Sequence, residues 1–133
     1  MGRKPRVLIV DDEQDFANTL AERLALRDFD TVVKKDGEGA LVAVENNPPD
    51  VVVLDIRMPG IGGFEVLRRI KSTHPRVQVI LLTGHGSTGD GIKGMELGAF
   101  DYLIKPVDIK DLMTKIKAAI ESSGFSTEEQ GKS

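Results

Sequence analysis

The sequence predicts an α/β domain in which a doubly wound sheet of five parallel strands is covered by helices on both faces. Three of the expected strands, residues 7–10, 51–54 and 79–82, are continuous apolar runs, which is typical of strands buried on both faces. Segments with apolar residues at helical spacing separate these runs, so that strand and helix alternate five times along the chain. Such alternation favours parallel strands joined by right-handed crossovers.

Each strand–helix unit can be placed in order along the chain. Two weaker strands complete the set of five: residues 31–33 follow the first helix, and the short run 102–104 precedes the last one. Apolar residues at helical spacing mark helices after four of the strands. They are Phe16, Leu20 and Leu24, then Ala40, Leu41 and Val44, then Phe64, Leu67 and Ile70, and finally Leu112, Ile116 and Ile120. Turn-forming pairs such as Pro48-Pro49, Pro59-Gly60 and Gly62-Gly63 separate the units.

Composition limits the class of function. The chain has 133 residues, the size of one domain, and 40% of them are hydrophobic, which is enough to bury a core. Lys and Arg number 18 against 21 Asp and Glu, and the resulting charge of −3 argues against a nucleic-acid or anionic-membrane surface as the main function. The absence of cysteine excludes disulfides, thiolate metal sites and thiol catalysis. Without a long apolar stretch or a secretory leader, a cytoplasmic location is expected.

Polar side chains follow four of the five expected strands. Asp11 and Asp12 come after the first, Asp55 after the third, Thr83 after the fourth and Lys105 after the fifth. The carboxyl ends of parallel strands meet at one edge of the sheet, where ligands bind. Clustered carboxylates repel one another unless a cation neutralises them, and oxygen ligands without His or Cys favour Mg²⁺. Together with an ammonium and a hydroxyl, they predict a site for phosphoryl transfer, with Asp55 as the nucleophile.

Each of these residues also has a simpler explanation when taken alone. Asp12 or Asp15 would serve as a cap of the first helix, and an isolated lysine or threonine at a strand end is commonplace. The joint placement at one sheet edge favours the functional interpretation. His74 and His85 are expected to be turn and loop residues, because two separate histidines do not make a metal site. Arg57 and His85 each lie two residues beyond a candidate site residue.

Four segments give the sequence a family resemblance: VLIVDDE at 7–13, VVVLDIRMPGIGGFEVL at 51–67, ILLTGHG at 80–86 and GAFDYLIKP at 98–106. Together they resemble the receiver domain of bacterial two-component response regulators, of the CheY-like superfamily. The resemblance implies a flavodoxin-like (βα)₅ fold with strand order 2-1-3-4-5. It covers residues 6–122, which leaves a short extension at residues 1–5 and a polar tail, or the start of a linker, at residues 123–133.

The resemblance also implies roles for individual residues. Asp55 would accept a phosphoryl group from a sensor histidine kinase or phosphotransfer protein. Asp11, Asp12 and Asp55, with the backbone carbonyl of Arg57, would hold Mg²⁺, while Thr83 and Lys105 would contact the phosphoryl oxygens. Tyr102 matches the switch aromatic that turns inward on activation, which alters the surface made by the fourth helix, fifth strand and fifth helix. A cis peptide bond is implied at Lys105–Pro106. A phosphorylation-dependent homodimer is compatible with this scheme.

The region of the fourth helix departs from a typical helical sequence. Residues 84–98 include six glycines, and each glycine inside a helix costs about 1 kcal/mol relative to alanine. This composition predicts a helix that is short, or frayed at its start, in the resting protein. The alternative is that packing of Ile92, Met95 and Leu97 maintains an ordinary helix.

Two other classes of function remain to be separated from the receiver. A phosphatase or phosphotransferase of the haloacid dehalogenase type also uses an aspartyl nucleophile with Mg²⁺, but it needs a second acid where this chain has Arg57. A degenerate receiver would signal without phosphate, which the complete set of candidate residues argues against. The receiver would thus be a signalling phosphoacceptor that acts catalytically only on itself. The sequence does not identify the kinase, the output, or whether an effector domain normally follows.

Overall fold

The computed structural model describes residues 3–58, 60–84 and 88–123 of the chain. Within these residues, five parallel strands form one sheet in the order β2-β1-β3-β4-β5. The strands are β1 (Arg6–Val10), β2 (Asp30–Lys34), β3 (Val51–Asp55), β4 (Gln78–Thr83) and β5 (Asp101–Ile104). The predicted fold class is therefore confirmed, including the strand order.

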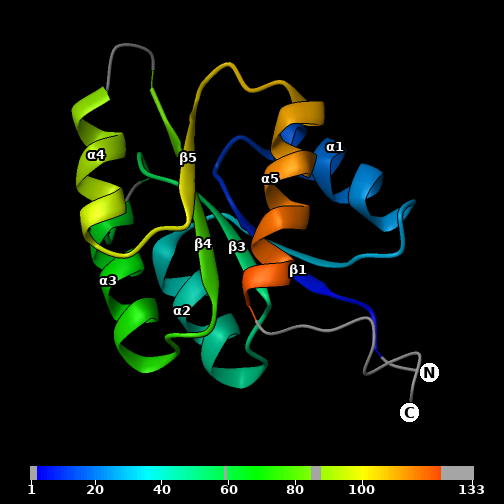
Figure 1. Cartoon of the computed structure of the whole chain (residues 1–133), viewed down its shortest axis with the longest axis horizontal. Coiled ribbons are helices and arrows are strands. Elements are labelled where there is room, and N and C mark those ends of the chain that lie inside the picture. The colour runs from blue at the N-terminus through cyan, green and yellow to red at the C-terminus, as the bar shows by residue number, and fades with distance from the viewer. Residues whose placement is uncertain (1–2, 59, 85–87, 124–133) are drawn as a thin grey trace.

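Five helices alternate with the strands in the described part of the chain. They are α1 (Gln14–Ala25), α2 (Gly37–Asn46), α3 (Gly63–Thr73), α4 (Thr88–Glu96) and α5 (Ile109–Ser122). Figure 1 shows α1 and α5 on one face of the sheet and α2, α3 and α4 on the other. None of the described helices is both long enough and apolar enough to cross a membrane.

The two faces of the sheet carry separate hydrophobic cores. Val7 and Ile9 of β1 pack in the core under α1 and α5, whereas Leu8 and Val10 pack in the core under α2 and α3. Successive side chains of a strand point to opposite faces, so a strand buried on both faces must be apolar throughout. That requirement explains why the central strands are continuous apolar runs.

β2 is the least regular strand in sequence because it lies at an edge of the sheet. Its residues alternate between exposed and partly buried, and Val32 remains 46% exposed. The expected strand at residues 31–33 is thus real but extends by one residue at each end. An edge strand has a neighbour on one side only, so the selection for a continuous apolar run is weaker there.

The N-terminal segment is attached to the start of β3 through a buried carboxylate. The Arg3 guanidinium donates to both oxygens of Asp50 at 2.7 and 2.8 Å, and the backbone N–H of Arg6 donates to the same carboxylate at 2.8 Å. Burial would raise the pKa of Asp50, but these hydrogen bonds and the charges of Arg3 and Arg6 outweigh it, so the pKa lies below its usual value. Residues 3–6 are therefore part of the folded domain.

α4 contains three of the glycines that suggested a weak helix. Gly89, Gly91 and Gly94 all lie inside it, and its nine residues make it the shortest of the described helices. Fraying at its start stays a prediction, to be tested by hydrogen exchange across residues 87–94. Several positions named in the sequence, namely Pro59, His85, Gly86 and the tail from residue 124, lie outside the described residues.

Candidate phosphoryl-acceptor site

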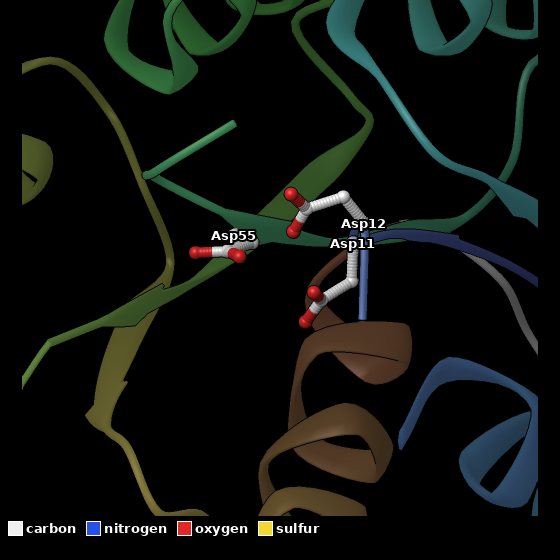
Figure 2. A group of neighbouring side chains, drawn as sticks. All are labelled: Asp11, Asp12 and Asp55. Atoms are coloured by element: carbon white, nitrogen blue, oxygen red, sulfur yellow. The ribbon is translucent and has the colours of Figure 1, made fainter. Parts of the chain in front are cut away.

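Three aspartates meet at the carboxyl ends of β1 and β3. Asp11 and Asp12 directly follow β1, and Asp55 is the last residue of β3. One carboxylate oxygen from each lies within 4.8 Å of the others, although Asp11 and Asp55 are buried and Asp12 is exposed. Figure 2 shows Asp55 opposite the Asp11–Asp12 pair at this edge of the sheet. The predicted cluster of carboxylates is therefore present.

The alternative explanation of these aspartates as helix caps does not agree with the geometry. The residue before α1 is Glu13, and no side chain caps the helix there. Instead, Asp11 Oδ1 accepts a hydrogen bond from the backbone N–H of Glu13 at 2.9 Å, which orients the Asp11 carboxylate. The genuine aspartate caps are elsewhere, at Asp36 of α2 and Asp108 of α5.

Lys105 places its ammonium among the acids. Its Nζ lies 3.1 Å from Asp11 Oδ2, 3.2 Å from Asp55 Oδ2 and 2.5 Å from Glu13 Oε1. The Lys105–Pro106 bond is cis, as expected, and the Lys105 backbone N–H donates to the Thr83 carbonyl at 2.7 Å. The end of β5 is thereby fixed against the end of β4, with the Lys105 side chain over the cluster.

The pKa values of Asp55 and Lys105 are both raised, for different reasons. Burial raises the pKa of Asp55 to about 6, and the Asp11 charge adds to this, while the Arg57 N–H and Lys105 oppose it. Burial alone would lower the pKa of Lys105, but hydrogen bonds with Glu13 and Asp11 and the charge of Asp55 raise it above its usual value. Lys105 is therefore a fixed positive charge, whereas burial disfavours the charged form of Asp55.

Thr83 is the last residue of β4, and Tyr102 lies in the neighbouring strand β5. Thr83 is 1% exposed, and its hydroxyl donates to the Leu103 carbonyl at 3.5 Å. Tyr102 is partly buried and packs against the core under α2 and α3. Arg57 takes part through its backbone N–H, which donates to Asp55 Oδ1 at 3.1 Å. His74 lies at the end of α3, where its Nδ1 is 2.8 Å from the Thr73 hydroxyl.

Two contributions to the site were not predicted from the sequence. Glu13 makes the shortest contact to Lys105, and its position in the DDE string after the first strand was the available signal. Gly63 begins α3 directly against the backbone that follows Asp55: a Cβ there would lie 2.6 Å from the Ile56 Cα. The DDE string does not show that the partner of Glu13 is Lys105, 92 residues away, and the close approach of Gly63 to Ile56 is visible only in the structure.

The donor set fits a hard divalent cation. Asp11, Asp12 and Asp55 offer only carboxylate oxygens, which suit Mg²⁺ better than softer metals. With Glu13, these acids bring four formal negative charges, and Lys105 brings one positive charge. Asp11 and Asp55 are nearly or fully buried. Bringing in an anionic phosphoryl donor would require further positive charge at this edge.

Comparison with known proteins agrees with the geometry. The sequence model of the family described as "Response regulator receiver domain" matches residues 7–117. Similar curated proteins include the transcriptional regulatory proteins CpxR of Escherichia coli (strain K12), 37% identical over 125 residues, and PrrA of Mycobacterium tuberculosis, 38% identical over 120 residues. These alignments cover 94% and 90% of this chain but 53% and 52% of the relatives. The chain thus spans about half the length of these curated relatives.

Solved structures show the same likeness over most of the chain. The receiver domain of the Francisella response regulator 1452 has a TM-score of 0.83 at 31% identity, covering 89% of this chain and 98% of that one. A CheY-like receiver domain protein from Methanospirillum hungatei JF-1 has a TM-score of 0.85 at 27% identity, covering 90% and 96%. Fold, strand order and the matched sequence agree, and the chain belongs to the response regulator receiver domains of two-component systems.

Proposed function

We propose that this receiver accepts a phosphoryl group on Asp55 from phosphohistidine of a sensor kinase or phosphotransfer protein. The observation that carries the proposal is the position of Lys105 Nζ, within 3.2 Å of the carboxylates of both Asp11 and Asp55. The ammonium stands where charge would develop on the transferred group, and the acids stand where a cation would be held. A pure binding module has no need of this arrangement.

Asp11, Asp12 and Asp55, together with the backbone carbonyl of Arg57, would hold Mg²⁺, which when bound supplies the positive charge that draws the phosphoryl group toward Asp55. One carboxylate oxygen of Asp55 then forms the new O–P bond while the histidine N–P bond breaks, and the freed imidazole nitrogen takes a proton from solvent. Lys105 pairs with a phosphoryl oxygen and keeps the charge of the product balanced.

The response to phosphorylation would start at Thr83. A phosphoryl group adds a charge of about −1.5 to −2 and three strong acceptor oxygens, which would compete with the Leu103 carbonyl for the Thr83 hydroxyl. Movement of Thr83 leaves room on the same face of the sheet for Tyr102 to turn inward. The surface of α4, β5 and α5 would then be biased toward a second state, which an output partner or a second copy of the chain reads.

The haloacid dehalogenase alternative has little support. The residue two positions after Asp55 is Arg57, whose backbone N–H holds the Asp55 carboxylate, and no second acid stands there as a proton donor. Under the proposal, a cytoplasmic histidine kinase is the upstream partner. The transcriptional role of the curated relatives makes an effector linked to this domain the proposed output.

The proposal is tested with Mg²⁺ and acetyl phosphate. Intact mass should show one phosphoryl group per chain, labile to hydroxylamine, and chelation of Mg²⁺ should prevent its formation. Asp15→Asn, an exposed residue of α1, is the matched control and should label normally, whereas Asp55→Asn should not. Rapid multiple turnover of the donor would instead indicate a phosphatase. Absence of labelling with acetyl phosphate and with a phosphohistidine donor would indicate a degenerate receiver.

Glu13 should weaken the binding of phosphoryl analogues by occupying Lys105. The Glu13 side chain is 64% exposed, and exposed ion pairs contribute about 0.2–1 kcal/mol. We therefore expect Glu13→Gln to tighten beryllofluoride binding in the presence of Mg²⁺ by up to about fivefold, less so in high salt. Titration followed by NMR measures this, with Glu22→Gln on α1 as a control for net charge. Weaker binding by Glu13→Gln than by Glu22→Gln would contradict the competition.

A further inference from the structure

The Tyr102 ring lies directly against the backbone of α4 at Gly91. A Cβ built on Gly91 would overlap the ring at Cε2 and would lie 2.6 Å from both Cδ2 and Cζ. Real Cβ atoms do not approach other atoms this closely, so the present ring position requires glycine at residue 91. The backbone of Gly91 is helical and has no positive φ, which means that the requirement comes from the ring and not from the main chain.

The other two glycines inside α4 do not meet the Tyr102 ring. A Cβ on Gly89 would have nothing within 4 Å, whereas one on Gly94 would overlap Cδ1 of Leu81. Gly91 and Gly94 are buried, while Gly89 is exposed. The buried face of α4 is therefore made of glycine at the two positions where it meets β4 and β5, and the side chains of the sheet fill the space that helix side chains would normally occupy.

The partners of these glycines are adjacent in the sheet. Leu81 of β4 is paired with Tyr102 of β5, and both belong to the core on the α4 side. Thr83 lies two residues beyond Leu81, so its side chain points to the same face. The ring of Tyr102 thus lies against the helix backbone at Gly91, on the face of the sheet to which Thr83 also points. α4 also contacts α3 through Lys93, whose Nζ lies 4.5 Å from the centre of the Phe64 ring.

We propose that Gly91 is a positioning residue for Tyr102, because it holds the ring in its resting position by offering a surface without a side chain. The ring lies against the helix backbone at this position, so a side chain at residue 91 would take the space that the ring now occupies. The Tyr102 position in the resting protein is then set by residue 91. This inference deepens the proposed function, since it names the residue of α4 that responds when Tyr102 turns; its first two tests need neither phosphoryl donor nor Mg²⁺.

The sequence supplies an unusually specific probe. Tyr102 is the only tyrosine, and the chain has no tryptophan, so tyrosine fluorescence of the unlabelled protein reports on this ring alone. In Gly91→Ala, the equilibrium constant that favours the present ring position over its alternative should fall about fivefold or more, as expected when overpacking of about 1 kcal/mol acts on a two-state equilibrium. Acrylamide quenching of Tyr102 should change accordingly in the metal-free protein.

Gly89→Ala is the matched control for this measurement. It makes the same chemical change in the same helix, but the added Cβ would have nothing within 4 Å outside the helix's own backbone. Its quenching should equal that of the wild type. If Gly91→Ala also equals the wild type, or if both variants change alike, Gly91 does not position the ring and the proposal is wrong.

A double-mutant cycle in urea provides an independent test should Gly91→Ala fold poorly. With Tyr102→Ala the ring is gone, and Gly91→Ala should then stabilise the protein as much as Gly89→Ala does in the wild type. The coupling between positions 91 and 102 should be about fivefold or more in the unfolding equilibrium constant. Additive effects of the two substitutions would overturn the proposal.

The link to the proposed function is tested separately with Mg²⁺ and beryllofluoride. The wild type should show a change in Tyr102 quenching when it binds the analogue. If it does and Gly91→Ala binds the analogue about fivefold more tightly, then Gly91 favours the resting state, as proposed. Equal or weaker binding by Gly91→Ala would show that it does not. A wild type without any response to the analogue would count against the proposed function alone, because the quenching and the urea cycle do not depend on it.

Discussion

Replacing Asp55 with asparagine is expected to stabilise the protein at neutral pH and, under the proposed function, to prevent phosphorylation. Burial raises the pKa of Asp55 to about 6, so the folded state disfavours the charge that this residue carries at pH 7. Each unit of pKa shift corresponds to about 1.4 kcal/mol. The neutral amide lacks this cost, and its oxygen can still accept the hydrogen bond from the Arg57 N–H.

The direction of the pH effect follows from this shift. A carboxyl group with a raised folded-state pKa contributes stability below its unfolded pKa, near 3.8, and loses that contribution as the pH rises through about 6. The difference in unfolding free energy between Asp55→Asn and the wild type should therefore be small near pH 3.5, below the unfolded pKa. It should grow to about 1–3 kcal/mol by pH 7.5.

Urea unfolding at several pH values without Mg²⁺ measures the effect. Mg²⁺ should then stabilise the wild type much more than Asp55→Asn, since a ligand of the folded state raises its stability. Such a loss of stability at a functional residue is an example of the trade-off between stability and activity. A variant that is less stable than the wild type across this whole pH range would show that the Lys105 contact outweighs the burial of Asp55.

Gly63→Ala should destabilise the fold and distort the candidate site. Its Cβ would lie 2.6 Å from the Ile56 Cα and 2.9 Å from the Ile56 carbonyl oxygen. Backbone atoms cannot rotate away as a flexible side chain can, so we expect about 3 kcal/mol, at the upper end of the usual cost of overpacking. Because Ile56 lies between Asp55 and Arg57, binding of Mg²⁺ and beryllofluoride should weaken as well.

Gly62→Ala is the natural comparison for this substitution. A Cβ on Gly62 would have nothing within 4 Å, and its φ of −66° suits alanine. Its unfolding free energy should stay within about 0.5 kcal/mol of the wild type. Urea unfolding of both variants, with binding measured by NMR, separates the effect of position 63 from the general effect of replacing a glycine. Equal stabilities would show that α3 shifts to accommodate the methyl group.

The sequence allowed the fold and the location of the candidate site to be predicted because both depend on short-range patterns. Apolar runs such as residues 51–54 identify strands buried on both faces, and the topology of parallel sheets then brings Asp11, Asp55 and Lys105 to one edge. The strand order came from the family resemblance. The residue roles remain proposals, although the carboxylates and the ammonium lie close together as expected.

The contacts that determine behaviour at the site were beyond sequence reasoning. Glu13 reaches Lys105 across 92 residues of chain, and nothing in the DDE string distinguishes that partner from solvent. The glycines of α4 suggested a poorly formed helix, because helix propensity is a property of single residues. Gly91 and Gly94 instead allow Tyr102 and Leu81 to approach the helix backbone, which is visible only once the sheet and the helix are placed together.

The attachment of Arg3 and Arg6 to Asp50 bears on how this domain is produced for experiments. Trimming the polypeptide to the family match at residues 7–117 would delete both hydrogen-bond donors of a buried carboxylate, along with the end of α5, where Ala119 and Ile120 are buried. Expression clones should start no later than Arg3 and continue through Ser123. An affinity tag at the N-terminus needs a spacer that leaves the Arg3 guanidinium able to contact Asp50.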